Sequence, residues 1–136
     1  MRPRALLPLV LAGLAGGVQG QPGGGNAAAG RSVYAACIHC HQIGPVARNA
    51  FGPPLNGIVG RRAGRMPGYA YSSALKAADI VWTEERLAAF IRDPSGVVPG
   101  TKMRFWGVGL NERKLADLMA YLRTVPADGS AQTHVP

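Results

Sequence analysis

The chain has 136 residues, including 19 Gly and 11 Pro but only 2 Cys. This length allows one domain, and an apolar share of 47% excludes an intrinsically disordered protein. Two cysteines cannot build a multi-bridge disulfide scaffold or fill a four-thiolate metal site. The net charge of +8 favours acidic partners, but no arginine-rich run indicates a nucleic-acid partner.

Residues 1–20 have the pattern of a secretory signal peptide. Arg2 and Arg4 form a basic start, residues 5–18 are uncharged and mostly apolar, and Val18 and Gly20 are small residues at the expected cleavage site. The apolar run is shorter than the ~20 residues that cross a bilayer. We expect cleavage near Gly20 and export to the periplasm; an uncleaved anchor or a buried core helix are the alternatives.

Composition divides the remaining chain into three parts. Residues 21–29 are Gly-rich and predict a flexible tether, whereas residues 30–126 predict one folded domain. Residues 127–136 resemble the tether and predict a flexible tail.

The folded part predicts helices and loops without a convincing strand. Residues 30–36 are typical of the last turns of a helix, and residues 72–78 of a short one. Thr83 can cap a helix that ends at Asp93, and Asn111 can cap a last helix that ends before Pro126.

Residues 43–71 hold many of the Gly and Pro residues and show no clear periodicity. A loop of this length without secondary structure is unusual in a compact domain. We therefore expect it to wrap around something other than protein.

Both cysteines lie in one C-x-x-C-H motif, Cys37-Ile38-His39-Cys40-His41, which is the attachment signature of c-type haem. The two thiols can each form a thioether to the same porphyrin, and His41 can then ligate the iron. A thioredoxin-like pair would need a βαβ pattern that is absent here. A zinc site would need a second ligand pair, but His39 is too close and His134 lies in the tail. A disulfide between Cys37 and Cys40 would close a tight, weakly stabilising loop.

A sixth iron ligand has several candidates. Met103 is favoured, because its loop is braced by Pro and Gly and His/Met ligation is a known mode. Met66 is as suited to filling a gap as to ligation, and Met119 lies on the apolar face of the last helix. His39 cannot reach the other face of the haem, and His134 is in the tail.

In these motifs the sequence resembles the class I cytochromes c, of the mitochondrial and bacterial c2-like type, from Gly30 to Leu122. The resemblance implies a small single-domain all-α fold wrapped around one haem c, attached through Cys37 and Cys40. The matching motifs are Gly52-Pro53-Pro54-Leu55-Asn56-Gly57, Gly60-Arg61, Pro67-Gly68-Tyr69, Tyr71, Trp82, Pro99-Gly100-Thr101-Lys102-Met103 and Leu118-Met119-Ala120-Tyr121-Leu122.

The resemblance also implies individual roles around the haem. The carbonyl of Pro53 would accept a hydrogen bond from the His41 ring, and Tyr71 and Trp82 would hold a propionate. Arg61 would supply positive charge near that propionate. Phe105 would cover the haem face beside residues 98–103, which we call the Met loop because they carry Met103. Ordinary aromatic packing is the alternative for Tyr71 and Trp82.

A further implied feature is structural. Gly30, Tyr34, Leu118 and Tyr121 would form the contact where the first and last helices cross.

The sequence departs from the mitochondrial pattern in the haem pocket. Phe90 and Leu75 stand where a Tyr and an Asn would be, so Thr101 lacks those polar neighbours. We predict a drier pocket that holds Met103 firmly against displacement at alkaline pH.

A second departure from the mitochondrial pattern lies around the haem edge, where the mitochondrial proteins carry a ring of lysines. Lys102 remains, but small or apolar residues occupy several of the other positions. The expected docking face is therefore largely uncharged, with a looser basic rim. The replaced positions are Ala36, Ala50, Ser95, Gly96, Gly109 and Leu110.

These features predict an exported electron carrier, not an enzyme, whose iron cycles between Fe(II) and Fe(III) by outer-sphere transfer through the exposed haem edge. Redox proteins are the expected donor and acceptor, either membrane respiratory or photosynthetic complexes or a periplasmic dehydrogenase. The main alternative is a haem subunit bound to one such dehydrogenase, so the protein is a monomer or part of a hetero-complex. A ligand-binding or peroxidatic haem protein would require Met103 off the iron.

Overall fold

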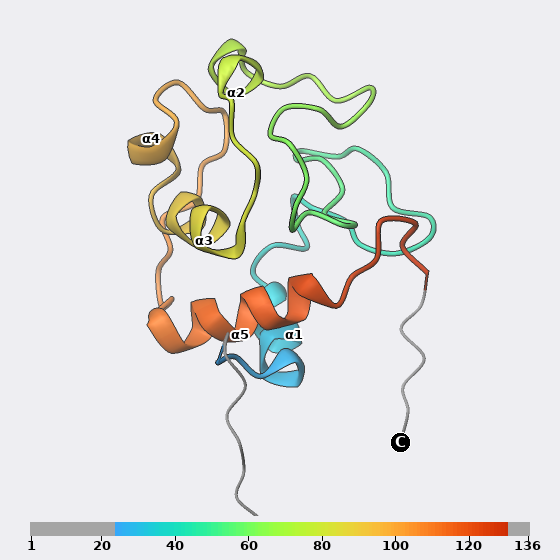
Figure 1. Cartoon of the computed structure of the whole chain (residues 1–136), viewed down its shortest axis with the longest axis vertical. Coiled ribbons are helices and arrows are strands. Elements are labelled where there is room, and N and C mark those ends of the chain that lie inside the picture. Colours follow the sequence, from blue (N-terminus) through green and yellow to red (C-terminus); the bar gives the residue numbers. More distant parts are fainter. Residues whose placement is uncertain (1–23, 131–136) are drawn as a thin grey trace, which may run out of the picture.

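The computed structural model describes residues 24–130. Its helices are α1 (Ala27–Tyr34), α2 (Ser73–Ala77), α3 (Glu84–Arg92), α4 (Pro94–Val97) and α5 (Glu112–Arg123). Within residues 24–130 there is no strand, and one isolated antiparallel bridge joins Arg62 to Val81. The predicted all-α fold with long loops is confirmed (Figure 1). No helix in the described range is long and apolar enough to span a membrane.

Two helices begin at the caps that the sequence predicts. The Thr83 side chain accepts a hydrogen bond from the backbone N–H of Arg86 at 3.2 Å, at the start of α3. The Asn111 side chain accepts a hydrogen bond from the backbone N–H of Lys114 at 2.9 Å, at the start of α5. Each cap satisfies one of the backbone donors that the first helical turn leaves without a partner.

The short helix α4 was not predicted. Asp93 ends α3 as expected, but its side chain also accepts a hydrogen bond from the N–H of Gly96 at 2.9 Å. Pro94 is the first residue of α4, where its missing N–H costs nothing. One residue therefore closes one helix and caps the next.

Helices α1 and α5 cross in close contact (Figure 1). A Cβ atom at Gly30 would lie 1.9 Å from the carbonyl oxygen of Asp117, so only glycine allows the two backbones to approach this closely. The rings of Tyr34 and Tyr121 pack beside this point with centroids 5.6 Å apart, and Leu118 is almost fully buried. The helix crossing implied by the resemblance is present.

Helix α1 begins before residue 30. Helix α1 begins at Ala27 because Asn26 caps it, and the Asp117 carboxylate on α5 accepts a hydrogen bond from the Asn26 N–H at 2.7 Å. Residues 27–29, expected in the flexible tether 21–29, are therefore helical. The predicted signal peptide lies outside the described residues.

Residues just after 126 contact the long loop 43–71. A Cβ atom at Gly57 would fall 2.8 Å from the Cα atom of Ala127, and one at Gly129 would fall 2.2 Å from the Gly44 carbonyl oxygen. The start of the predicted tail 127–136 thus packs against the long loop 43–71 instead of extending from the domain. Residues 131–136 lie outside the described range.

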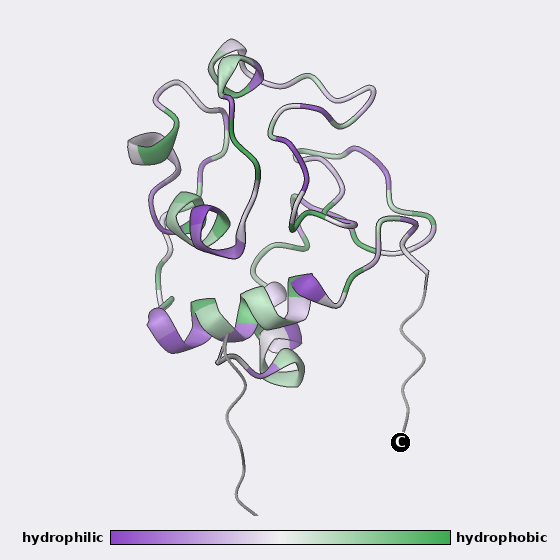
Figure 2. Cartoon of the chain, viewed as in Figure 1, coloured by the Kyte–Doolittle hydropathy of each residue, from purple (hydrophilic) through white to green (hydrophobic). Residues whose placement is uncertain are grey.

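The hydrophobic core is formed by α3 and α5 together with Tyr34 of α1 and the loops. Figure 2 shows apolar residues on both helices and on the loop segments that face them. The inward faces of α3 and α5 do not fill the interior, because several of their side chains line an internal cavity. These are Leu87, Phe90, Ile91, Leu118 and Leu122.

Candidate cofactor site

The internal cavity has a volume of about 330 Å³. Its wall is formed by five parts of the chain: α3, α5, the segment after α1, the long loop and the Met loop. The wall includes all ten residues predicted for the site: Cys37, Cys40, His41, Pro53, Arg61, Tyr71, Trp82, Thr101, Met103 and Phe105.

The cysteine motif follows α1 as a tight turn. The N–H groups of Cys40 and His41 both bond to the carbonyl of Cys37, at 3.1 and 2.8 Å. This turn brings three side chains of the motif to one wall of the cavity. Both cysteines are free thiols, with Cys37 partly buried and Cys40 exposed, and burial raises the pKa of Cys37 to about 11.

The His41 ring has a defined orientation. Its Nδ1 lies 2.7 Å from the carbonyl oxygen of Pro53, and because a carbonyl only accepts, Nδ1 carries the proton. Nε2 is then left with its lone pair. Burial lowers the pKa of His41, which favours this neutral form. The backbone of Gly52 touches the ring, since a Cβ atom there would lie 2.3 Å from Cε1.

Tyr34 supports the same histidine from the other side, and the sequence did not reveal this. The Tyr34 hydroxyl donates to the backbone carbonyl of His41 at 2.8 Å. Burial raises the pKa of Tyr34 to about 12, so the hydroxyl stays protonated and remains a donor. The resemblance implies only a place at the helix crossing for Tyr34.

Met103 follows a rigid turn. The N–H of Thr101 bonds to the carbonyl of Val98 at 3.0 Å, with Pro99 and Gly100 between them. Gly100 has φ +87°, so this is the Pro-Gly sequence that a type II turn requires. The Thr101 hydroxyl then accepts the N–H of Met103 at 3.4 Å, and Met103 is half-buried in the cavity wall.

The other candidate ligands lie elsewhere. Met119 is buried in the core of α5, and neither it nor Met66 lines the cavity. His39 is exposed, and its side chain is not part of the cavity wall. His134 lies outside the described residues.

One end of the cavity is polar and cationic. The Arg61 guanidinium donates to the carbonyls of Asn56 at 3.1 Å and Pro54 at 2.9 Å, which fixes its direction. Backbone pairing joins it to Trp82, whose N–H donates to the Arg61 carbonyl at 2.9 Å. Tyr71 lies near this charge, and burial raises the pKa of its hydroxyl. A fixed cation and a protonated phenol therefore face the same space.

Another part of the wall, next to Trp82, is apolar. Phe90 packs against Trp82 with ring centroids 4.9 Å apart, and Leu75 and Phe105 complete this surface. Thr101 is a buried polar residue of the wall, and its hydroxyl accepts a hydrogen bond from the Met103 N–H. The drier pocket that we expect from Phe90 and Leu75 stays a prediction.

Tyr69 and Phe51 also line the cavity, and we had not predicted them as site residues. The Tyr69 hydroxyl donates to the carbonyl of Phe51, and the Tyr69 and Tyr71 rings meet edge to face at 4.7 Å. Tyr69 was visible in the sequence as part of a matching motif. Phe51 carried no signal, since exposed aromatic residues follow no periodicity in a loop.

These residues fit a haem attached through the cysteine motif. Two free thiols, a neutral imidazole with a free Nε2 and a thioether surround one cavity, which is the donor set of a His/Met haem site. The polar end offers a cation for anionic propionates. Gly52 allows His41 to stand close to the backbone without a clash.

Comparison with known proteins agrees with this site. Residues 27–126 match the family model for cytochrome c. The chain is 50% identical over 105 residues to a cytochrome c2 of Blastochloris viridis, covering 77% of this chain and 82% of that protein. It is 43% identical over 108 residues to a cytochrome c-550 of Nitrobacter winogradskyi, covering 79% of this chain and 98% of that protein.

A solved structure shows the same fold. Cytochrome cH from Methylobacterium extorquens superposes with a TM-score of 0.68 and 42% sequence identity, covering 74% of this chain and 99% of that chain. The family match accounts for haem c bound covalently through Cys37 and Cys40, and for electron transfer in place of enzymatic catalysis. The chain belongs to the cytochrome c family, as a class I, cytochrome c2-like member.

Proposed function

We propose that His41 and Met103 would bind the haem iron of this electron carrier. The observation that carries the proposal is the locked His41 ring, with Nδ1 donating to Pro53 and Nε2 free, in the cavity that Met103 also lines. Bound haem supplies a one-electron Fe(II)/Fe(III) couple. With both side chains on the iron, the haem would transfer electrons without binding a substrate.

The remaining wall residues would tune and hold the cofactor. Arg61, Tyr71 and Trp82 would bind a propionate at the polar end, because a buried carboxylate needs hydrogen bonds and a counter-charge. Phe105 and Thr101 would shield and position the Met103 side. An apolar pocket with a thioether ligand favours the reduced state and raises the potential.

We further propose that the protein works in the periplasm and shuttles electrons between redox proteins. The signal-peptide pattern of residues 1–20 supports export. The donor and acceptor would be membrane respiratory or photosynthetic complexes.

The ligand set is tested by visible spectroscopy and redox titration of the exported holoprotein. We expect covalent haem, a Met–iron charge-transfer band and one reversible one-electron step. Met103→Ala should abolish the band and lower the potential, whereas Met66→Leu should change neither. A band that survives Met103→Ala would overturn the assignment.

A second candidate is a haem subunit bound to one periplasmic dehydrogenase. The exposed apolar side chains of Trp106 and Val108 favour it, since lasting interfaces bury such groups. Gel filtration of a native extract distinguishes the two functions. A carrier elutes at the size of the free domain, and a subunit elutes with its enzyme.

A further inference from the structure

Residues 66–71, which we call the bridging segment, are tied by side-chain hydrogen bonds to two other parts of the chain. Asn49 and Tyr69 connect the segment to residues 49–51, which follow the cysteine motif. Lys102 connects it to the Met loop. The segment therefore links the side of the cavity that holds His41 to the side that holds Met103.

One peptide unit carries the connection to the cysteine motif. The N–H of Gly52 donates to the carbonyl of Cys40 at 2.8 Å. The carbonyl of the same peptide unit belongs to Phe51, and it accepts the hydrogen bond from the Tyr69 hydroxyl. The Gly52 backbone also touches the His41 ring. The bridging segment is thus bonded to the backbone against which His41 packs.

A second hydrogen bond reinforces this connection. The side-chain amide of Asn49 donates to the carbonyl of Pro67 at 3.1 Å. Burial raises the pKa of Tyr69, so its hydroxyl remains protonated and can donate to Phe51. Both of these bonds join the bridging segment to residues 49–51, and neither includes an atom of the Met loop.

The bridging segment is itself compact. The Tyr71 hydroxyl accepts a hydrogen bond from the Met66 N–H at 3.3 Å, and the Tyr71 N–H donates to the Tyr69 carbonyl at 3.1 Å. Gly68 has φ +71°, which lets the chain turn back on itself. Because these bonds hold the segment in one shape, a shift at Tyr69 moves the neighbouring Ala70 as well.

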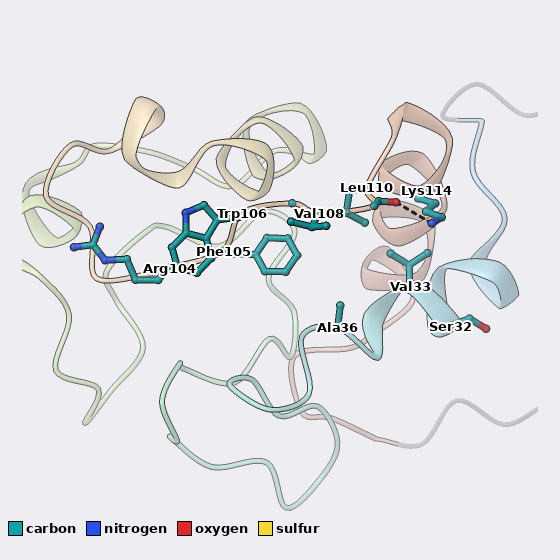
Figure 3. Close-up of a pocket in the computed structure, with 11 residues that line it drawn as sticks. Ser32, Val33, Ala36, Arg104, Phe105, Trp106, Val108, Leu110 and Lys114 are labelled. Carbon is teal, nitrogen blue, oxygen red and sulfur yellow. Dashed lines mark hydrogen bonds between the residues drawn. The ribbon is translucent and has the colours of Figure 1, made fainter.

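The connection to the Met loop is made directly beside Met103. The Lys102 ammonium donates to the Ala70 carbonyl at 3.2 Å. The chain after Met103 is more weakly packed, since Trp106 and Val108 are 82% and 91% exposed and lie beside an open groove (Figure 3). The hydrogen bond between Lys102 and Ala70 is therefore well placed to hold Met103 on the cavity wall.

Farther along, Figure 3 shows where the segment that follows Met103 is attached to α5. The Lys114 ammonium donates to the Gly109 carbonyl at 2.8 Å. This attachment lies several residues beyond Met103, whereas Lys102 is its immediate neighbour in the chain.

We propose that the bridging segment couples the two sides of the cavity, so that the hydrogen bonds of Asn49 and Tyr69 help to hold Met103 in place through Ala70 and Lys102. Asn49, Tyr69 and Lys102 are positioning residues, because they act on Met103 through the backbone that carries it. This inference rests on the proposed iron ligation by His41 and Met103, and it deepens that proposal. The coupling keeps the coordination closed, as electron transfer without substrate binding requires.

The test measures how easily added imidazole replaces Met103 in the ferric holoprotein at neutral pH. Loss of the Met–iron band during a titration with imidazole gives the association constant. We expect Lys102→Ala to raise this constant about fivefold and Tyr69→Phe to raise it about threefold, since each removes one hydrogen bond. Tyr69→Phe is informative because the Tyr69 hydroxyl bonds to Phe51 and not to the Met loop.

Matched variants separate the hydrogen bonds from effects of charge and of a lost hydroxyl. Lys102→Arg keeps a donor at this position and should stay close to the wild type. Lys76→Ala removes an exposed lysine of α2, and Tyr121→Phe removes a hydroxyl at the helix crossing. Both should leave the association constant unchanged. An increase in Lys76→Ala equal to that in Lys102→Ala would assign the effect to charge and overturn the proposal.

The double variant of Lys102 and Tyr69 decides whether the two bonds are coupled. Once the Lys102 bond is lost, a shift of the bridging segment no longer reaches the Met loop, so Tyr69→Phe should have no further effect and the increase should stay about fivefold. Independent bonds would multiply to about 15-fold. A 15-fold increase would therefore show that the bridging segment does not couple the two sides.

The same titration distinguishes failure of this inference from failure of the ligand assignment. If the wild type shows the Met–iron band and Tyr69→Phe binds imidazole no more tightly, the coupling proposal is wrong and the ligation by Met103 stands. If the wild-type holoprotein has no Met–iron band, Met103 is not a ligand and the coupling proposal fails with it.

Discussion

The hydroxyl of Tyr34 on α1 donates a hydrogen bond of 2.8 Å to the backbone carbonyl of His41. The same tyrosine ring packs against Tyr121 on α5. Tyr34 therefore connects the crossing of the first and last helices to the histidine that we propose as an iron ligand. Packing of the helix pair and orientation of His41 are coupled through one side chain.

This coupling predicts the effect of Tyr34→Phe. The variant keeps the ring packing but leaves the His41 carbonyl without its partner, so the free energy of unfolding should fall by about 1 kcal/mol. Denaturant unfolding of the holoprotein measures it. Tyr121→Phe is the control, because Tyr121 makes the same ring contact without a bond to His41. If the free energy of unfolding falls equally in the two variants, the hydrogen bond from the Tyr34 hydroxyl to His41 does not contribute to stability.

Glycine at position 52 is predicted to be essential for the orientation of His41. In Gly52→Ala the new methyl group would lie 2.3 Å from Cε1 of the imidazole, so the ring must move from the Pro53 carbonyl. We expect a destabilisation of about 1–3 kcal/mol and an altered haem spectrum. Gly30→Ala is the comparison, because its methyl group would meet the Asp117 carbonyl on α5 instead. Gly30→Ala should also unfold more easily, but with a native spectrum, and a native spectrum in Gly52→Ala would refute the prediction.

The apolar wall around Met103 predicts resistance to alkaline displacement of this ligand. Phe90 is 5% exposed, and a hydroxyl added there enters a pocket with few polar partners, as does the amide of Leu75→Asn. In Phe90→Tyr and Leu75→Asn we expect the Met–iron band to disappear at a pH about one unit lower than in the wild type. A shift of one pH unit corresponds to about 1.4 kcal/mol of lost stability of the Met103 ligation. Leu75→Met is the apolar control. Variants that hold the band to the same or a higher pH would disprove the idea.

The spread of positive charge predicts weak electrostatic steering. Arg62, Arg92 and Arg123 are paired with the carboxylates of Asp79, Glu112 and Glu84. The oxidation rate constant with native membranes should fall by less than about tenfold between ~0.01 M and ~1 M salt.

Added lysines provide the contrast for the salt dependence. Ala36 and Ala50 are exposed at positions where mitochondrial proteins carry part of the lysine ring. Replacing both by Lys should make the salt dependence steeper, while Ala77→Lys on α2 should not. A steep fall in the wild type itself would contradict the prediction.

Much of the candidate site could be predicted because its signals are local. The spacing of Cys37, Cys40 and His41 is set within one turn of the chain, and the Pro99-Gly100 turn determines the loop before Met103. The caps Thr83 and Asn111 act on donors three residues away. Interactions over so few residues leave a readable pattern in the sequence.

The domain boundaries could not be read in this way. Residues 27–29 look like a linker by composition, and they are helical because Asp117 on α5 accepts the Asn26 N–H. Residues 127–129 pack because Gly57 leaves room for Ala127, and because Gly129 lacks the Cβ atom that would meet the Gly44 carbonyl oxygen. These partners are separated by many residues in the chain, so composition alone does not predict that they are in contact.

The sequence by itself determined the cofactor, its attachment and the helical class, since these depend on residue types at short fixed spacings. The tertiary structure decided which methionine lines the cavity and how Tyr34 and Gly52 hold His41. The reason is physical. Close approach, burial and exposure arise only when segments far apart in the chain pack against one another.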